Sequence, residues 1–307
     1  MPIYKQSGSK LVPIKEKKVG LEKTIQTLTE ENLSEVFGLS FIVSELQLNN
    51  LRIDTLAFDE ETKSFVVIEY KKDRSFSIVD QGFAYLALLL NNKADFILEY
   101  NEKSKRNLKK SDVDWSQARV IFVASSFTKY QQEAIGFQDL PIELWEVKKY
   151  DSGLFSFDQV RASEKSESIK TIAKNKDIEK VSREIKQYSL DDHIKPTWNK
   201  SKELFDEFSQ RVLELDPRFE IKPVKSYIGF NMGSKNMITV RIRTSKLILE
   251  LLRTNPENIK DPEKRLKYVK NSLEHYNQHI SLFDIKNEDD IDYAMLLAKQ
   301  KYKNFVG

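Results

Sequence analysis

The chain of 307 residues has no cysteine, a formal net charge of +3 and 32% charged residues. The lack of cysteine excludes disulfides and thiolate zinc sites, and a nearly neutral charge means that any surface for nucleic acid must be local. The length and a hydrophobic content of 40% leave room for two domains. The lysine-rich N-terminus lacks a signal-peptide core, and the longest apolar run, residues 83–90, is too short to span a bilayer. We therefore expect a cytoplasmic protein with no membrane partner.

The first predicted elements are a helix and a strand. Apolar residues recur near helical spacing from Leu21 to Phe37. A strand-like run follows at residues 41–46 and contains Glu45. Glu22 lies near the start of the helix, where the helix dipole favours any acidic residue, so an ordinary solvated acid explains it as well as a functional one.

A hairpin is predicted next, from residues 51–58 and 64–71. Both segments are apolar and rich in β-formers, and the five polar residues between them make a connection of hairpin length. If the turn is centred between Glu61 and Thr62, Asp54 lies opposite Glu69 with Cβ atoms about 5 Å apart. Alternation along the second strand places Glu69 and Lys71 on one face.

Two carboxylates and one amine in this arrangement are typical of a metal-dependent phosphodiesterase. Asp54 and Glu69 can share one Mg²⁺ or Mn²⁺ ion, because Mg²⁺ takes one or two carboxylates and completes its shell with water and phosphate oxygens. The Lys71 ammonium can orient water and offset charge on the phosphate. An exposed hairpin that happens to carry these residues remains the simpler explanation of the isolated motif in so charged a chain.

The segment 77–90 is predicted to be helical, and Gln81 and Tyr85 lie four residues apart on it. Residues at this spacing share a helix face, so the two side chains point together. A surface pair beside the core stripe of the same helix is the alternative for these two residues.

The order of these residues resembles the PD-(D/E)XK nuclease superfamily, in particular its archaeal mismatch-type and RecB-like endonucleases, over about residues 18–100. Ile53 stands where the family name has proline, and Gln81 with Tyr85 matches the Gln-x-x-x-Tyr signature of the RecB-like branch. Glu22 matches the glutamate of the family's first helix. Glu45 lies where several relatives have an acidic residue.

The resemblance implies a metal-dependent DNA endonuclease of a repair or phage-defence system. Its catalytic residues would be Asp54, Glu69, Lys71, Glu22 and Gln81, with Asp54 and Glu69 as ligands of Mg²⁺ or Mn²⁺. It allows a homodimer, since many relatives cut as dimers. A catalytically silent nuclease-fold protein that binds nucleic acid or a protein partner remains the alternative.

The rest of the N-terminal half continues as strands and helices. Segments 94–100, 118–124, 142–147 and 154–160 are predicted to be strands, and residues 128–137 a helix. With the resemblance, they predict an α/β restriction-endonuclease-like core, a mixed central sheet flanked by helices. A basic loop between the first two of these strands could bind a phosphate backbone next to the active site, although a solvated loop is equally compatible with its composition. The weaker candidates for nucleic-acid binding are Tyr85, Lys105, Arg106, Lys109 and Lys110.

Composition predicts three parts: a nuclease-like domain at residues 1–160, a charged linker at 161–196 that includes a short exposed helix at 178–188, and a small α+β domain at 197–307. The last part resembles a domain of unknown function that often follows nuclease-like regions, and we expect it to serve recognition or assembly. Its predicted helices are 197–213, 262–276 and 289–303, and its predicted strands are 219–224, 226–231, 236–243 and 247–252.

Overall fold

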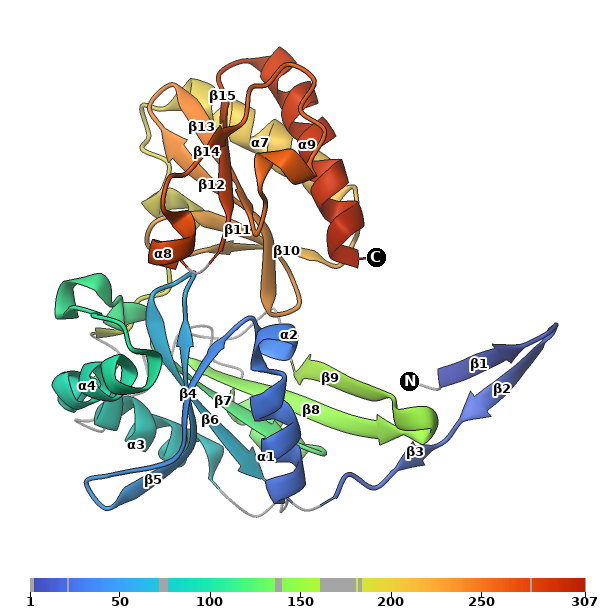
Figure 1. The fold of residues 1–307 in the computed structure, drawn as a ribbon, viewed down its shortest axis with the longest axis vertical. Helices are drawn as coiled ribbons and strands as arrows, with labels where there is room; N and C mark the ends of the chain where they lie inside the picture. The colour runs from blue at the N-terminus through green and yellow to red at the C-terminus, as the bar shows by residue number, and fades with distance from the viewer. Residues whose placement is uncertain are drawn as a thin grey trace. The chain divides into compact units, whose positions relative to one another are not determined.

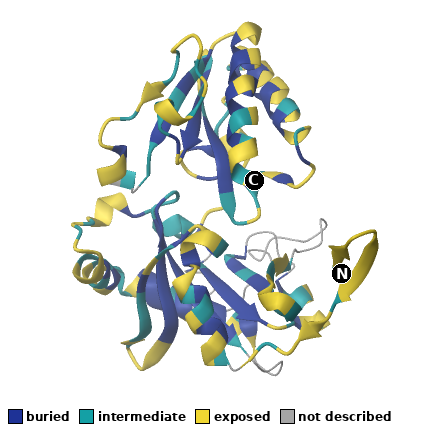
Figure 2. Cartoon of the chain, turned by 45° about the vertical axis from the view of Figure 1, so that its right-hand side comes forward, coloured by how far each residue is buried: buried dark blue, intermediate teal, exposed yellow. Residues whose placement is uncertain are grey.

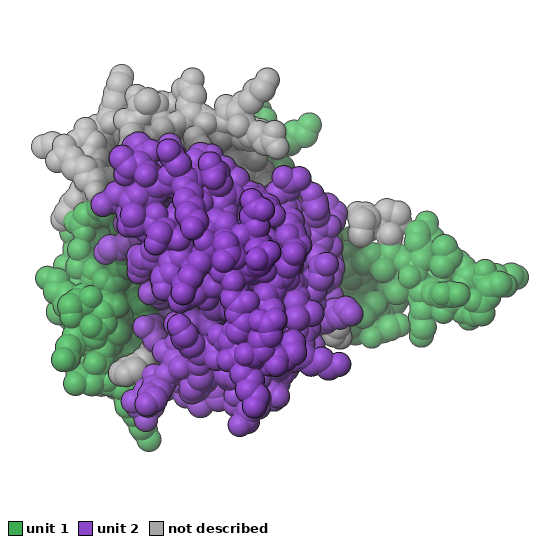
Figure 3. Space-filling view, turned by 90° about the horizontal axis from the view of Figure 1, so that it is seen from above, with its two compact units in different colours: residues 1–59, 63–186 green, residues 60–62, 187–307 purple. Residues whose placement is uncertain are grey.

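The computed structural model describes residues 3–20, 22–71, 77–135, 140–160, 181, 184–276 and 278–306. The chain divides into two compact units (Figure 3). The N-terminal unit comprises Met1–Asp59 and Lys63–Lys186, and the C-terminal unit comprises Glu60–Thr62 and Gln187–Gly307. Each unit has a hydrophobic core of its own. Within the described ranges, no helix combines the length and apolar character that a membrane span needs.

The N-terminal unit is built on a seven-stranded mixed sheet with the order β3-β8-β7-β6-β5-β4, and β9 pairs with β8. β7 runs parallel to both β6 and β8, and the other neighbours are antiparallel. The strands are β3 (Glu16–Lys17), β4 (Ser40–Leu48), β5 (Leu51–Asp59), β6 (Ser64–Lys71), β7 (Arg119–Ala124), β8 (Ile142–Tyr150) and β9 (Phe155–Val160). The central strands β6 and β7 are buried along almost their whole length, which explains their continuous apolar sequences.

Helices cover both faces of this sheet (Figures 1 and 2). The α-helices of this unit are α1 (Glu22–Glu31), α2 (Leu33–Phe37), α3 (Ile78–Asn91), α4 (Lys93–Ser104) and α5 (Lys129–Ala134). Short 3₁₀ turns are η1 (Lys110–Asp112), η2 (Trp115–Gln117) and η3 (Asp151–Gly153). α1 and α2 pack with Val66, Ile68 and Tyr70 of β6, whereas α3 and α4 pack on the opposite face with Phe65 and Val67. The unit is therefore α/β, with a mixed sheet between helices as predicted.

The β5–β6 hairpin forms in the predicted register. Asp59 lies opposite Ser64, and Thr55 lies opposite Ile68. The alternation of β6 also follows the prediction, because Val66, Ile68 and Tyr70 share one face. This register decides which residues meet at the far end of the hairpin.

One predicted strand of this unit is wrong, because residues 94–100 belong to helix α4. Within this segment Phe96 and Tyr100 are buried, four residues apart, whereas Leu98 between them is 59% exposed. This burial has the period of a helix and not of a strand. An apolar run of this length does not by itself distinguish the two.

The C-terminal unit is mostly sheet, with the strand order β10-β11-β12-β13-β15-β14. Its strands are β10 (Phe219–Pro223), β11 (Ile228–Met232), β12 (Lys235–Arg243), β13 (Lys246–Leu252), β14 (Lys267–Tyr268) and β15 (Ile280–Ile285). Its helical elements are η5 (Leu190–Asp192), α7 (Asn199–Leu213), η6 (Pro256–Asn258), α8 (Ser272–Tyr276) and α9 (Glu288–Val306). The predicted meander β10 to β13 is antiparallel throughout, and α7 and α9 share its core.

The helix predicted at 262–276 is wrong over most of its length. Asp261 accepts hydrogen bonds from the backbone N–H groups of Arg265, at 3.0 Å, and Leu266, at 2.8 Å, and so holds the chain as a loop. Such bonds compete with helix formation. The guanidinium of Arg265 also lies 4.7 Å from the ring centroid of Phe283 in β15, a strand that the sequence did not predict.

The predicted linker is only partly covered by the described residues, since 161–180, 182 and 183 lie outside them. Val181 and Ile185 are buried in the core of the N-terminal unit. The expected exposed helix at 178–188 falls partly outside the described residues; within them Val181 and Ile185 are not exposed, and residues 185–188 are not helical. The domain boundaries themselves remain a prediction.

Candidate active site

β5 and β6 separate at the point where the two predicted metal ligands lie. Their pairing ends at Thr55 and Ile68. Beyond this point β6 stays paired with β7, and β5 stays paired with β4. Asp54 and Glu69 come next in the same register. Asp54 Oδ2 accepts the backbone N–H of Tyr70 at 3.0 Å, so a carboxylate closes the ladder where the strands part.

Glu69 is the centre of the cluster and is 4% exposed. Lys71 Nζ lies 2.7 Å from its Oε1, and Gln81 Nε2 donates to the same oxygen at 2.8 Å. The hydroxyl of Tyr85 donates to Oε2 at 2.8 Å. Three residues that the sequence singled out, Lys71 of β6 and Gln81 and Tyr85 of α3, therefore contact the carboxylate of a fourth, Glu69.

Helix α3 approaches the sheet closely because of Gly82. A Cβ atom at this position would lie 2.3 Å from Cδ1 of Ile142 in β8, well inside van der Waals contact. The absence of a side chain lets the helix settle on the sheet, with Gln81 and Tyr85 on either side of the glycine. Burial and the charge of Glu69 raise the pKa of Tyr85, so its hydroxyl stays protonated as a donor.

We expect Gly82→Ala to destabilise the protein by about 1 to 2 kcal/mol, because overpacking at Ile142 outweighs the helix propensity gained, which is about 1 kcal/mol. Ile142→Val removes the colliding Cδ1 atom and should restore part of the loss in the double variant. Urea unfolding of the four proteins measures both effects. A Gly82→Ala variant more stable than the parent would show that the close packing does not constrain α3.

Asp54 lies in an environment that disfavours a second negative charge. It is 6% exposed. Burial, followed by the charge of Glu69, raises its pKa to about 6, and the Tyr70 N–H and the Lys71 ammonium act in the opposite direction. The Arg52 guanidinium is more distant, 3.8 Å from Oδ1. A cation between Asp54 and Glu69 would relieve this unfavourable charge.

The donor set is compatible with a hard cation such as Mg²⁺ or Mn²⁺. Among the residues that the structure describes, no group of three His, Cys, Asp or Glu side chains is arranged to hold a metal. A zinc site needs three or four such ligands, whereas Mg²⁺ needs only one or two carboxylates with water and phosphate oxygens. Asp54 and Glu69 together meet that smaller requirement.

Without metal, the stability of the protein should depend on the ionisation of Asp54. Its pKa in the folded state, about 6, exceeds the ordinary value of 3.8, so the folded state binds the proton more tightly. The stabilisation is present at low pH and is lost as the pH rises through 6. Asp54→Asn does not ionise, and in EDTA it should gain up to about 3 kcal/mol over the parent between pH 4 and pH 7. Urea unfolding across this range measures the difference, and a gap that stays constant with pH would contradict it.

Helix α1 supports the strand that carries Asp54. Gln26 Nε2 donates to the backbone oxygen of Asp54 at 3.0 Å, and Glu30 Oε1 accepts the hydroxyl of Thr55 at 2.5 Å. Glu22 is half-buried and lies one helical turn before Gln26. Of these three polar residues the sequence analysis named Glu22 alone, although their i, i+4, i+8 spacing indicates one common face of the helix.

Glu45 has an unusual backbone in the middle of β4, with a φ of 58°. The flanking pairs in β4 and β5 place it beside Asp54. Its carboxylate lies 2.9 Å from Lys23 Nζ and 3.1 Å from Arg52 Nε. The hydrogen bond from Lys23 lowers the pKa of Glu45, which is therefore held as a charged acceptor at the edge of the cluster. A left-handed residue inside a strand is costly, and such strain concentrates at functional sites.

A protein of Haemophilus influenzae, itself uncharacterized, is 41% identical to this chain over 305 residues, which are 99% of this chain and 100% of the relative. The chain belongs to the family of this protein. Residues 190–304 also match the family model described as Domain of unknown function (DUF5655). The prediction of a C-terminal domain of unknown function is thereby confirmed.

Three solved structures are similar only in part. A repair endonuclease from Pyrococcus abyssi gives a TM-score of 0.24 at 18% identity, over 43% of this chain and 50% of that one. An EndoMS complex with double-stranded DNA gives 0.25 at 17%, over 42% and 47%. Pyrococcus furiosus SfsA in complex with Ca²⁺ gives 0.25 at 14%, over 50% and 78%. This chain thus spans about half the length of the two endonucleases. TM-scores this low carry no weight for its fold or activity.

The basic loop after α4, residues 105–110, ends far from the carboxylates of Asp54 and Glu69. Lys105 follows α4, and Arg106 donates to the hydroxyl of Tyr100 at 3.2 Å. Past Lys109 and Lys110, the backbone N–H of Asp114 donates to the oxygen of Lys63, at the hairpin end of β6. Glu69 is six residues farther along this strand, about 20 Å away at the rise of a β-strand. The C-terminal end of the basic loop thus lies at the hairpin end of β6 and not at the carboxylates, and nucleic-acid binding by Lys105, Arg106, Lys109 and Lys110 stays a prediction.

Tyr85 is likewise placed for another role than contact with nucleic acid. It is 4% exposed, and its ring belongs to the core of the N-terminal unit. A base can stack only on an accessible ring, so Tyr85 acts through its hydroxyl on Glu69.

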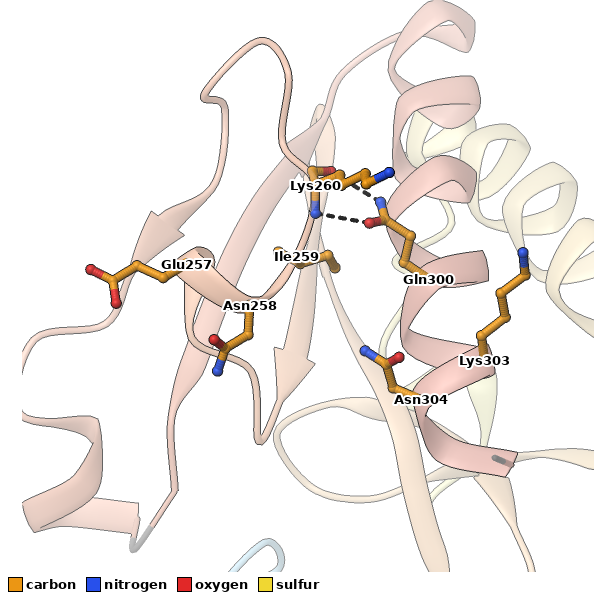
Figure 4. Close-up of a pocket in the computed structure, with 7 residues that line it drawn as sticks. All are labelled: Glu257, Asn258, Ile259, Lys260, Gln300, Lys303 and Asn304. Carbon is orange, nitrogen blue, oxygen red and sulfur yellow. Dashed lines mark hydrogen bonds between the residues drawn. The ribbon is translucent and has the colours of Figure 1, made fainter.

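The segment matched by the DUF5655 model carries a hollow of about 390 Å³ beside α9, lined mostly by polar residues (Figure 4). Gln300 pins the loop at one side, because its Oε1 accepts the backbone N–H of Lys260 at 2.8 Å and its Nε2 donates to the Lys260 oxygen at 3.0 Å. The lining residues are Glu257, Asn258, Ile259, Lys260, Gln300, Lys303 and Asn304. This set has no nucleophile beside a base, so it indicates no chemistry of its own.

Proposed function

We propose that this chain is a metal-dependent DNA endonuclease that hydrolyses phosphodiester bonds. The observation that carries the proposal is the meeting of Asp54, Glu69 and Lys71 where β5 and β6 part. Two buried carboxylates next to each other are unfavourable for stability, and the Lys71 ammonium offsets this only in part, which supports a functional reason for their presence.

The carboxylates of Asp54 and Glu69 would hold the metal ion. A bound Mg²⁺ or Mn²⁺ would polarise the phosphate and lower the pKa of an attacking water. Gln81 and Tyr85 are positioning residues, since their hydrogen bonds to Glu69 fix the orientation of its carboxylate. Gln26 holds the backbone of Asp54 in the same way.

Lys71 would act on the water and the phosphate. Its ammonium now lies 2.7 Å from Glu69 Oε1. In the reaction, a water oxygen bonds to phosphorus, the bond from phosphorus to the leaving sugar oxygen breaks, and that oxygen takes up a proton. A cation beside the phosphate offsets the negative charge that develops in this step.

The direct test is cleavage of supercoiled, linear and single-stranded DNA, and of RNA, in Mg²⁺, Mn²⁺ or EDTA. We expect internal cuts in DNA with either metal and none in EDTA. Undamaged substrates in all conditions, at high protein concentration and with the fold verified by circular dichroism, would refute the proposed activity.

One observation favours the alternative of a silent nuclease-fold protein. Glu69 already accepts three hydrogen bonds from side chains, two at Oε1 and one at Oε2. If this network never opens, Glu69 can offer a metal ion only the one lone-pair position left on Oε2. Calorimetric titration with Mn²⁺ separates the two cases, since the silent protein should show no binding that Glu69→Gln removes.

A further inference from the structure

The chain begins with a hairpin that forms a sheet by itself. Within the part of the chain that the structure describes, β1 (Ile3–Ser7) and β2 (Lys10–Ile14) pair with each other and with no other strand. Apart from the half-buried Ile3 and Ile14, the residues of both strands are exposed (Figure 2). β3 then joins the hairpin to the main sheet through β8, and Lys17 Nζ lies 2.8 Å from Asp151. We call residues 3–18 the arm.

The arm is a strongly basic segment of the protein, although residues 103–110 hold a denser cluster of five basic residues with no acidic one. Residues 1–18 contain five lysines and one glutamate, a net +4, whereas the whole chain has +3, so all other residues together are slightly negative. The lysines are Lys5, Lys10, Lys15, Lys17 and Lys18, all exposed. A local charge of this size favours a polyanion over any neutral or acidic partner.

The two faces of the hairpin differ in chemistry. Opposed residues share a face, so Lys5 with Val12 and Ser7 with Lys10 lie on one side. The other side has Tyr4 opposite Pro13 and Gln6 opposite Leu11. Tyr4 is 51% and Leu11 66% exposed, so this second side presents uncovered apolar surface without a lysine, whereas on the first side the exposed Val12 lies beside lysines.

An isolated two-stranded hairpin is at best marginally stable in water, so the arm needs a partner to be held in place. A two-stranded ribbon fits the major groove of duplex DNA, where lysines reach phosphates and apolar side chains reach the base edges. A second copy of this chain fits less well, because two arms of +4 would repel each other.

We propose that the arm binds duplex DNA, with its lysines on the phosphate backbone and the Tyr4 and Leu11 side toward the groove. The inference rests on the proposed function for its choice of DNA as the polyanion. In this proposal the arm binds the DNA, and the residues where β5 and β6 part carry out the hydrolysis.

The test is equilibrium binding of the full chain to a fluorescent duplex of about 20 base pairs, followed by anisotropy at several salt concentrations in EDTA, where no cleavage occurs. The arm variant is Lys5→Gln with Lys10→Gln and Lys15→Gln. The control is Lys200→Gln with Lys222→Gln and Lys299→Gln, three exposed lysines of the C-terminal unit. Both variants lose the same charge, so only its location differs.

We expect the arm variant to bind at least about tenfold more weakly near 100 mM salt, with a slope of log K against log salt shallower by about 2 to 3. The control should stay within about twofold of the parent. Equal loss in both variants, no change in the arm variant, or no binding by the parent would each overturn the proposal.

Two further measurements separate the arm from the rest. Tyr4→Ser with Leu11→Ser should weaken DNA binding and leave the sedimentation of the chain unchanged; a changed oligomeric state with unaltered DNA binding would make the arm an interface between copies and overturn the proposal. Arm-dependent binding without cleavage in Mg²⁺ would support the arm and refute the endonuclease. DNA cleavage together with unweakened DNA binding by the arm variant would support the endonuclease and refute the role of the arm.

Discussion

Asp54→Asn and Glu69→Gln should each lower metal-dependent DNA cleavage by about three orders of magnitude, which corresponds to about 4 kcal/mol in the barrier. Each change removes a negative charge from the metal site and keeps the shape of the side chain. Both carboxylates are buried, so water cannot easily replace the lost ligand.

The fold should survive these changes. Asp54→Asn is expected to be at least as stable as the parent at neutral pH, because it removes a carboxylate whose pKa burial raises. Loss of cleavage can therefore be assigned to the site and not to unfolding. Asp95→Asn, an exposed carboxylate of α4, is the matched control and should cut at the rate of the parent. If either site variant stays within a few-fold of the parent, that residue does not hold the metal.

The hairpin of this site was predictable because its signals are local. Alternation along residues 64–71 and a polar connection of five residues fix the register of β5 and β6, and the register decides that Asp54 and Glu69 come together. The same is true of Gln81 and Tyr85, whose spacing follows from the helix period.

Contacts between distant segments were not predictable from the pattern. Gln26 reaches the backbone of Asp54, 28 residues away, and nothing in the sequence near either residue reports this. The sequence pattern does not distinguish Gly82 from other helical glycines. In the structure its missing side chain makes room for Ile142 of β8. Both contacts depend on packing between elements that are distant in the sequence. The pattern around a single residue indicates only its local structure.

The errors share a cause as well. Residues 94–100 and 262–276 were assigned from composition and approximate periodicity, and tertiary contacts overrode both. In the second, Asp261 binds two backbone N–H groups that a helix would have used. An aspartate just before a predicted helix can bind backbone N–H groups a few positions later, and this favours a loop over a helix.

Lys71→Ala should lower the rate of cleavage by about a hundredfold while leaving Mn²⁺ affinity nearly unchanged, because an ammonium acts on water and phosphate and is not a metal ligand. Its present partner makes the prediction sharper. Lys71 Nζ, at 2.7 Å, shares Glu69 Oε1 with the amide of Gln81, so its removal frees one acceptor position on that oxygen, and the affinity for the metal should hold or rise slightly. Single-turnover cleavage and calorimetric titration on the same preparation give the two quantities.

Lys71→Arg, which keeps the charge, should recover part of the rate, and Lys103→Ala on the surface of α4 is the control. A loss of Mn²⁺ affinity as large as the loss of rate would show that Lys71 organises the carboxylates themselves, and the division of roles between Lys71 and the metal ligands would then be wrong.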